Sequence, residues 1–126
     1  MLLKLDFSSD VPIYLQIRNQ IVMGIADGKL SPGERLPTIR ALANEAGINV
    51  MTINKAYALL KQEGYILADR KSGTIINPDI AKPGSITDKA KEDLKLVISE
   101  IKLAGVSKEK LIHLCSQLYD ETEAKK

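Results

Sequence analysis

The chain has few of the residues that build redox, metal or catalytic sites. Its 126 residues include one cysteine, one histidine, one phenylalanine and no tryptophan. Cys115 has no second cysteine with which to form an intramolecular disulfide, and His113 lacks a cluster of Cys, Asp or Glu at metal-ligand spacing. The sequence also lacks a glycine-rich phosphate-binding motif and a set of nucleophile, base and oxyanion donors. We therefore expect no cofactor, no metal and no enzymatic activity.

Long apolar runs are also missing from the sequence. No stretch approaches the roughly 20 apolar residues that a membrane-spanning helix needs, and the beginning of the chain does not resemble a secretory leader. We therefore expect a cytoplasmic protein that does not enter a membrane. The hydrophobic content of 44% is typical of a globular protein, while the net charge of +2 says little about binding to nucleic acid.

The most informative stretch runs from Ile39 to Leu60, where two segments with helical spacing are separated by a break. The first apolar stripe stops at Gly47, where a chain reversal needs a positive φ, and Asn49 is suited to cap a second helix that begins at Val50. Two short helices joined by a tight turn predict a helix-turn-helix. We expect the inward-facing positions to be Ile39, Leu42, Ala43, Ala46, Ile53, Ala56, Tyr57 and Leu60.

The second helix of this motif leaves one face free for a partner. Asn54 can donate to and accept from adenine, while Val50 and Met51 offer apolar surface to a thymine methyl group. These side chains predict an operator whose core leans towards A·T pairs. The alternative is that Asn54 is an ordinary exposed helix residue that contacts no partner. The free face contains Val50, Met51, Thr52, Asn54, Lys55 and Ala58.

A β-hairpin is predicted directly after this helix. Gly64 ends the helix, and Tyr65–Asp69 and Thr74–Asn77 have the composition of strands. A hairpin that follows a helix-turn-helix is called a wing, and the alternating segment Leu3–Phe7 is predicted to add a third strand to its edge. The loop at its tip is Arg70, Lys71, Ser72 and Gly73. Lys55, Lys61, Arg70 and Lys71 are candidates for phosphate contacts, or for ordinary solvated surface.

Two further helix starts are predicted from local signals. Polar residues 8–10 mark the entrance of a first helix ahead of Pro12, and isoleucines at steps of four bury one of its sides until it ends near Asp27 and Gly28. A connection that is rich in proline and glycine follows, and Pro37 is expected to open the next helix.

The C-terminal third has a different pattern, beginning after the segment Pro78–Gly84, which contains two prolines and a glycine. Ser85 is expected to start one helix that stops at Gly105, and Ser107 is expected to cap another. Two helices of about 20 and about 15 residues do not enclose their own apolar stripes, so self-association is expected. The predicted domains are residues 1–78, which bind DNA, and residues 79–126, which dimerise.

Several segments together resemble the GntR-type winged-helix transcription regulators, and in particular their short YtrA-like branch. The resemblance covers about 65 residues in the order and spacing of the family. It implies a winged helix-turn-helix that binds double-stranded DNA as a dimer, and the short helical tail is similar to the branch only in length and pattern. The matching segments are PIYLQIRNQI from Pro12, GKLSPGERLPTIRALA from Gly28, GINVMTINKAYALLKQEGYI from Gly47 and SGT from Ser72.

The resemblance also implies roles for individual residues. Arg40 matches an arginine that reaches DNA from the first helix of the motif, and Thr52 matches a threonine of the recognition helix. Asn54 matches a frequent base or phosphate contact, and Gly73 matches the glycine of the wing tip. Val50 departs from the arginine or proline of many members, so no guanine contact is expected there.

We therefore predict a mainly α protein with a small β wing, in which a winged helix-turn-helix DNA-binding domain precedes a C-terminal two-helix dimerisation hairpin. The predicted function is that of a homodimeric repressor on an inverted-repeat operator, and the sequence identifies no effector. The alternative is a winged-helix module that binds proteins through Val50 and Met51. The predicted DNA-binding residues are Arg40, Val50, Met51, Thr52, Asn54, Lys55, Arg70, Lys71, Ser72 and Gly73.

Overall fold

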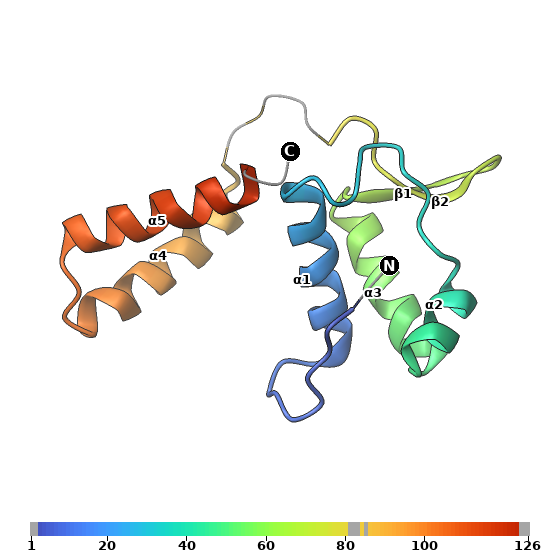
Figure 1. Cartoon of the computed structure of the whole chain (residues 1–126), viewed down its shortest axis with the longest axis horizontal. Coiled ribbons are helices and arrows are strands. Elements are labelled where there is room, and N and C mark those ends of the chain that lie inside the picture. The colour runs from blue at the N-terminus through green and yellow to red at the C-terminus, as the bar shows by residue number, and fades with distance from the viewer. Residues whose placement is uncertain (1–2, 81–83, 85, 124–126) are drawn as a thin grey trace.

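Five helices and two strands make up the part of the chain that the computed structural model describes, which is residues 3–80, 84 and 86–123. Figure 1 shows α1, α2, α3 and the two strands grouped in one body. The pair α4–α5 projects to the left of this body, and α5 contacts α1. In chain order, the elements are α1 (Ile13–Ala26), α2 (Ile39–Ala46), α3 (Val50–Gln62), β1 (Ile66–Asp69), β2 (Gly73–Ile76), α4 (Asp88–Leu103) and α5 (Lys108–Glu123).

The core of the winged body lies between α1, α2 and α3. Ile17 and Ile21 of α1 are at most 1% exposed and pack with the buried side chains of the other two helices. Small side chains at Ala43 and Ala56 allow the helices of the motif to approach closely. The remaining buried members of the core are Leu36, Leu42, Ile53, Tyr57, Leu60, Ile66 and Ile76.

The predicted turn between α2 and α3 is confirmed. Gly47 has a φ of +68°, a left-handed conformation that glycine adopts without a steric penalty, and it ends α2. Asn49 then caps α3, because its side-chain oxygen accepts a hydrogen bond of 2.7 Å from the backbone N–H of Met51. The start of α2 differs from the prediction at Pro37. Thr38 is the N-cap, and its hydroxyl accepts from the backbone N–H of Ala41, so α2 begins at Ile39.

The two strands form the predicted antiparallel wing, with Ile66 opposite Ile76 and Asp69 opposite Gly73. The predicted third strand at residues 3–7 is wrong, because the edge of β2 is already occupied. Arg35 forms an antiparallel bridge with Ile75, and the backbone of residues 33–36 makes hydrogen bonds to residues 74 and 76. The connection before α2 therefore takes the place expected for the N-terminal segment.

The N-terminal segment lies instead along α1, where two glutamine side chains supply the hydrogen bonds that a neighbouring strand would have made. The side-chain amide of Gln20 bonds both backbone groups of Lys4, and that of Gln16 bonds both backbone groups of Asp6. Residues 8–10 do not cap α1. The side chain of Asp6 bonds Ser8 and closes a local turn, and α1 begins after Pro12 without a side-chain cap.

The C-terminal pair forms two helices of 16 residues each. Thr87 caps α4, which begins at Asp88, so the predicted start at Ser85 is wrong, and Ser85 itself lies outside the described residues. Ser107 caps α5 as predicted, by accepting from the backbone N–H of Lys110 at 3.2 Å. None of the helices in the described part of the chain is long and apolar enough to span a membrane.

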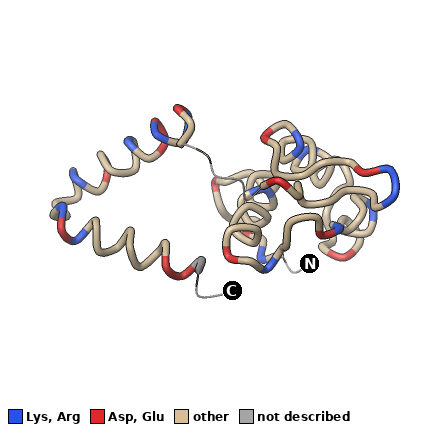
Figure 2. Tube along the Cα trace, turned by 90° about the horizontal axis from the view of Figure 1, so that it is seen from above, with Lys and Arg blue, Asp and Glu red and all other residues tan. Residues whose placement is uncertain are grey.

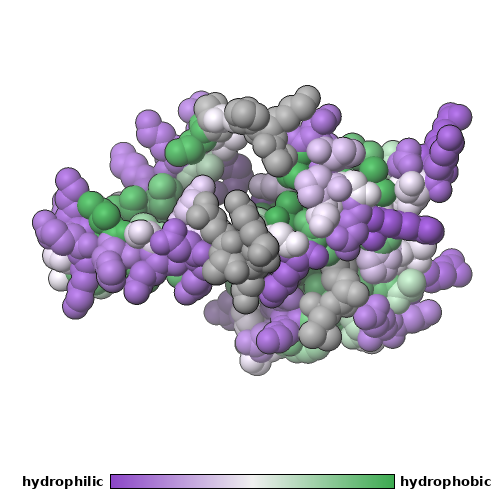
Figure 3. Space-filling model, turned by 45° about the horizontal axis from the view of Figure 1, so that its top comes forward, coloured by the Kyte–Doolittle hydropathy of each residue, from purple (hydrophilic) through white to green (hydrophobic). Residues whose placement is uncertain are grey.

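The α4–α5 pair leaves most of its apolar side chains uncovered. Figure 3 shows apolar side chains gathered on this part of the molecule, and Leu103 is 88% exposed. Other large apolar side chains exposed on the pair are Leu94, Leu96, Val97, Ile98, Ile112, Leu114, Leu118 and Tyr119.

Candidate nucleic-acid interface

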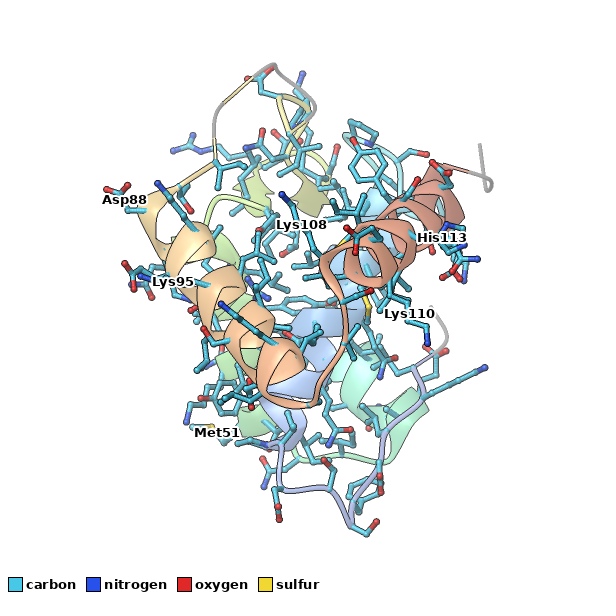
Figure 4. All side chains as sticks on the ribbon, turned by 90° about the vertical axis from the view of Figure 1, so that its left-hand side faces the viewer. Met51, Asp88, Lys95, Lys108, Lys110 and His113 are labelled. Carbon is cyan, nitrogen blue, oxygen red and sulfur yellow. The ribbon has the colours of Figure 1, made fainter. Side chains whose placement is uncertain are left out.

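The outer face of α3 begins at its first residue, as the sequence predicts. Val50 is 42% exposed and Met51 is 70% exposed, and Asn54 and Lys55 are also exposed. Figure 4 shows Met51 pointing outward at the edge of the molecule. Thr52 differs from its neighbours because it is half-buried. The face can therefore offer apolar, amide and ammonium groups to a partner without exposing the core.

A shallow hollow lies between α3 and the beginning of α1. Thr52, Asn54 and Lys55 line it from α3, together with Met51, while three consecutive residues line it from the start of α1. These three residues are Pro12, Ile13 and Tyr14. The first turn of α1 thus borders the predicted recognition face, an arrangement that the sequence did not predict.

Arg40 lies exposed on the first turn of α2, which packs against α3. Thr38, the exposed N-cap of the same helix, precedes it by two residues. The N-terminus of a helix carries a partial positive charge that favours anions. Arg40 and this helix end therefore both favour a negatively charged partner.

The wing tip is a basic turn with a fixed backbone. Arg70 and Lys71 are exposed, and a carboxylate oxygen of Asp69 accepts a hydrogen bond of 3.0 Å from the backbone N–H of Ser72. Gly73 follows with a φ of +76°, which favours glycine. Ser72 is half-buried, so its contribution to the tip is mainly this hydrogen bond. The positively charged turn forms the right-hand end of the molecule in Figure 2.

Arg35 is a candidate that the sequence analysis missed. The residue is exposed and pairs with Ile75 of the wing, and its Nε lies 3.8 Å from the position that a Cβ on Gly73 would take. A third cationic side chain therefore accompanies the wing. The GERLP segment around it contributed to the family resemblance, so the signal was present, but its position beside the wing depends on a pairing between distant segments.

Two polar contacts fix the orientation of α3. The buried hydroxyl of Tyr57 donates a hydrogen bond of 2.8 Å to the backbone carbonyl of Pro37, just before α2, and burial raises the pKa of Tyr57 to about 12. Glu63, directly after α3, accepts two hydrogen bonds of 2.8 and 2.9 Å from Arg18 of α1. These bonds to Glu63 raise the pKa of Arg18. These contacts fix the orientation of α3 relative to α1 and to the beginning of α2.

Together, the predicted site residues lie on α2, α3 and the wing. Figure 1 places α2, the beginning of α3 and the wing turn on the side of the molecule away from the α4–α5 pair. In the described part of the chain, we find no group of three or more His, Cys, Asp or Glu residues that could hold a metal ion.

Comparison with known proteins identifies similar chains along most of the length. The family model described as "Bacterial regulatory proteins, gntR family" matches residues 13–76. The HTH-type transcriptional repressor YtrA of Bacillus subtilis (strain 168) is 38% identical over 113 residues, which are 87% of this chain and 86% of that protein.

Two solved structures extend the comparison. A transcriptional antiterminator from Listeria monocytogenes EGD-e has a TM-score of 0.85 and 27% identity, and the match covers 97% of this chain and 92% of that chain. The structure of AraR(DBD) in complex with operator ORX1 has a TM-score of 0.53 and 27% identity, and the match covers 60% of this chain and 98% of that chain. The second match is restricted to about the length of the winged body.

Proposed function

The chain belongs to the gntR family of bacterial regulatory proteins and is a DNA-binding transcription regulator of the YtrA-like type; from this premise we propose that it acts as a homodimeric repressor on an inverted-repeat operator. The observation that carries the proposal is the outer face of α3, which is exposed from its first residue while the opposite face holds the core. An α-helix with such a face fits the major groove of B-DNA.

In this proposal, the first turns of α3 read bases. Asn54 pairs with an adenine, and Val50 and Met51 contact thymine methyl groups, so the core of each half-site leans towards A·T pairs. Both apolar residues are exposed to solvent, which supports a role in contact with a partner. Thr52, which is half-buried at the edge of this face, contacts the backbone beside the bases.

Phosphate contacts come from cations on α2, on α3 and on the wing. Arg40 and Lys55 lie on the helix-turn-helix, and Arg70 and Lys71 form the wing tip with Ser72 and Gly73. We add Arg35 to this set because it lies beside Gly73. Such contacts set affinity and register, and they make binding fall steeply as salt rises.

A second copy of the chain is the proposed partner of the α4–α5 pair. A winged domain at residues 1–78 and a dimerising segment at residues 79–126 account for the exposed apolar side chains of the pair, since a monomer rarely leaves a large contiguous apolar surface uncovered. A two-fold dimer places two α3 helices about 34 to 36 Å apart, which is one turn of DNA. The operator is therefore an inverted repeat.

Repression is proposed because YtrA of Bacillus subtilis, similar along most of both chains, is named a transcriptional repressor. The experiment is selection of bound sequences from random duplex DNA, followed by transcription in vitro from a promoter that contains the selected site. The proposal expects an inverted repeat and reduced transcription. A single unrepeated site, or increased transcription, would contradict the dimeric repressor.

Steep salt dependence on duplex DNA separates this function from the alternative of a protein-binding module. Asn54→Ala provides the base-reading variant, and it should lose discrimination at one position of each half-site. If the wild-type protein binds duplex DNA only weakly, and this binding does not change with salt, the result would favour the protein-binding module.

A further inference from the structure

An aromatic ring of α1 lies under a cation of α3. The Nζ atom of Lys55 lies 4.1 Å from the centre of the Tyr14 ring, which is well within the distance of a cation–π interaction. Tyr14 is half-buried in the first turn of α1, and Lys55 is exposed. Both side chains line the hollow that separates α1 from the beginning of α3. We call these two residues the Tyr14–Lys55 pair.

A second cation–π contact in the same body shows what distinguishes this pair. Arg18 lies 5.5 Å from the centre of the Tyr65 ring, and its guanidinium also forms an ion pair with Glu63 at 2.8 Å. Its charge is therefore already balanced by a carboxylate. Within residues 3–80, 84 and 86–123, Lys55 has no carboxylate partner, so its charge remains available to an external anion.

The Tyr14 ring also restricts the direction in which the Lys55 side chain points. Lysine has a flexible stem whose rotamer freedom is lost when its ammonium is fixed in one place. Contact with the Tyr14 ring holds Lys55 over the side of α3 that borders α1, next to the hollow and beside Asn54. The ring covers one side of the ammonium and leaves its other N–H groups able to donate to an oxygen anion.

We propose that Tyr14 is a positioning residue for DNA binding, which orients Lys55 towards a backbone phosphate on the α1 side of the recognition helix. Lys55 therefore contributes affinity without sequence preference, while base reading stays with its neighbours on α3. This inference rests on the proposed function, and it adds α1 to the elements that determine DNA affinity.

Three substitutions test the pair in the full-length protein: Tyr14→Phe, Tyr14→Leu and Lys55→Met. Phenylalanine keeps the face of the ring, and no hydrogen bond from the Tyr14 hydroxyl is found in the described part of the chain. Leucine keeps apolar packing but removes the ring, and methionine keeps the length of Lys55 without its charge. Affinities are measured by fluorescence anisotropy on the selected operator and on a scrambled duplex, across a range of salt concentrations.

Lys55→Met should lower the slope of log affinity against log salt by about 0.9 per protomer, equally on the two duplexes. Tyr14→Leu should weaken binding roughly two- to fivefold per protomer on both duplexes, and Tyr14→Phe should bind like the wild type. In the Lys55→Met background, Tyr14→Leu should have no further effect, because the positioned charge is already absent. Tyr65→Leu, which breaks the other cation–π contact, is the matched control and should not change the salt slope.

Equal loss in Tyr14→Phe and Tyr14→Leu, or a further loss from Tyr14→Leu in the Lys55→Met background, would overturn the inference. So would unchanged binding by Tyr14→Leu when the wild type binds well, and that result would leave the proposed function intact. A wild type without salt-dependent binding would overturn both. If Tyr14→Leu fails to fold, the NMR spectra of wild type and Tyr14→Phe replace it. Both should show a ring-current shift of the Lys55 side-chain signals, and its absence from the wild type would overturn the inference.

Discussion

Removing the two cations of the wing tip should reduce the salt dependence of DNA binding without unfolding the protein. The double variant Arg70→Ala and Lys71→Ala changes only exposed side chains. It keeps the hydrogen bond from the Ser72 N–H to Asp69, which closes the turn, and it keeps Gly73 with its positive φ. The backbone of the wing should therefore survive the loss of charge.

The magnitude follows from the number of phosphate contacts that disappear. Each contact contributes about 0.9 to the slope of log affinity against log salt, so a dimer that loses four cations should lose about 3.6 from that slope. When salt rises from about 0.05 to about 0.2 M, the affinity of the wild type should fall by a factor on the order of 10² larger than the factor by which the affinity of the variant falls.

The assay is anisotropy with a labelled operator duplex at several salt concentrations, accompanied by thermal unfolding. The control variant, Lys95→Ala with Lys110→Ala, removes the same charge from the α4–α5 pair, where Figure 4 shows both residues. It should keep the wild-type slope. A wing variant with the wild-type slope, or a control variant with the same loss as the wing variant, would refute the assignment of phosphate contacts to the wing tip.

Three further variants test the fold around the interface and its assembly. Gly47→Ala should destabilise the protein by about 1–2 kcal/mol in urea unfolding, because alanine is strained at a φ of +68°. The added Cβ would meet no atom within 4 Å, so no clash adds to this cost, and unchanged stability would contradict this reading. Tyr57→Phe should cost about 1 kcal/mol near neutral pH, since the Pro37 carbonyl loses its donor. Because the folded pKa of Tyr57 is raised to about 12 from an unfolded value of about 10, the stability that its neutral hydroxyl contributes is complete below about pH 10 and falls as pH rises. The advantage of the wild type over Tyr57→Phe should therefore shrink above about pH 10 and be lost before about pH 12, whereas parallel stability curves would refute the assignment. Leu94→Asp with Leu118→Asp places charges on side chains that are 49% and 52% exposed in the single chain, and it should yield a monomer in size-exclusion chromatography with the winged body still folded; an unchanged dimer would place the interface elsewhere.

Local signals were sufficient to predict the helix-turn-helix. Gly47 and Asn49 determine where α2 ends and α3 begins through their own φ angle and side-chain hydrogen bond, and neither effect depends on distant residues. The same is true of Ser107 before α5. The exposed positions of α3 follow from the same periodicity, and so the outer face of the helix could be predicted, except that Thr52 is half-buried.

Pairings between distant segments could not be predicted in this way. The alternation of Leu3 and Leu5 indicates an extended segment with one buried side, but it does not say what the segment pairs with. Gln16 and Gln20 provide its hydrogen bonds, while Arg35 occupies the edge of the wing. The same reasoning explains why Arg35 was missed and why the position of Tyr14 under a cation of α3 emerged only from the structure.

The presence of a hydroxyl group alone does not identify the N-cap of a helix. Both Ser85 and Thr87 are suitable N-cap residues by composition, and the structure uses Thr87, whose hydroxyl accepts from the backbone N–H of Ala90 at 3.1 Å. With Thr87 as the cap, Asp88 falls in the first turn of α4, where the helix dipole favours a negative charge.

The most direct test is the length and symmetry of the DNA sequence that full-length protein selects from random duplexes. Two exposed α3 faces in one dimer should select an inverted repeat whose half-sites are centred one helical turn apart, with A·T pairs that lose their enrichment in Asn54→Ala. An unrepeated site, a repeat in direct orientation, or a selected sequence that Asn54→Ala leaves unchanged would contradict the recognition helix described here.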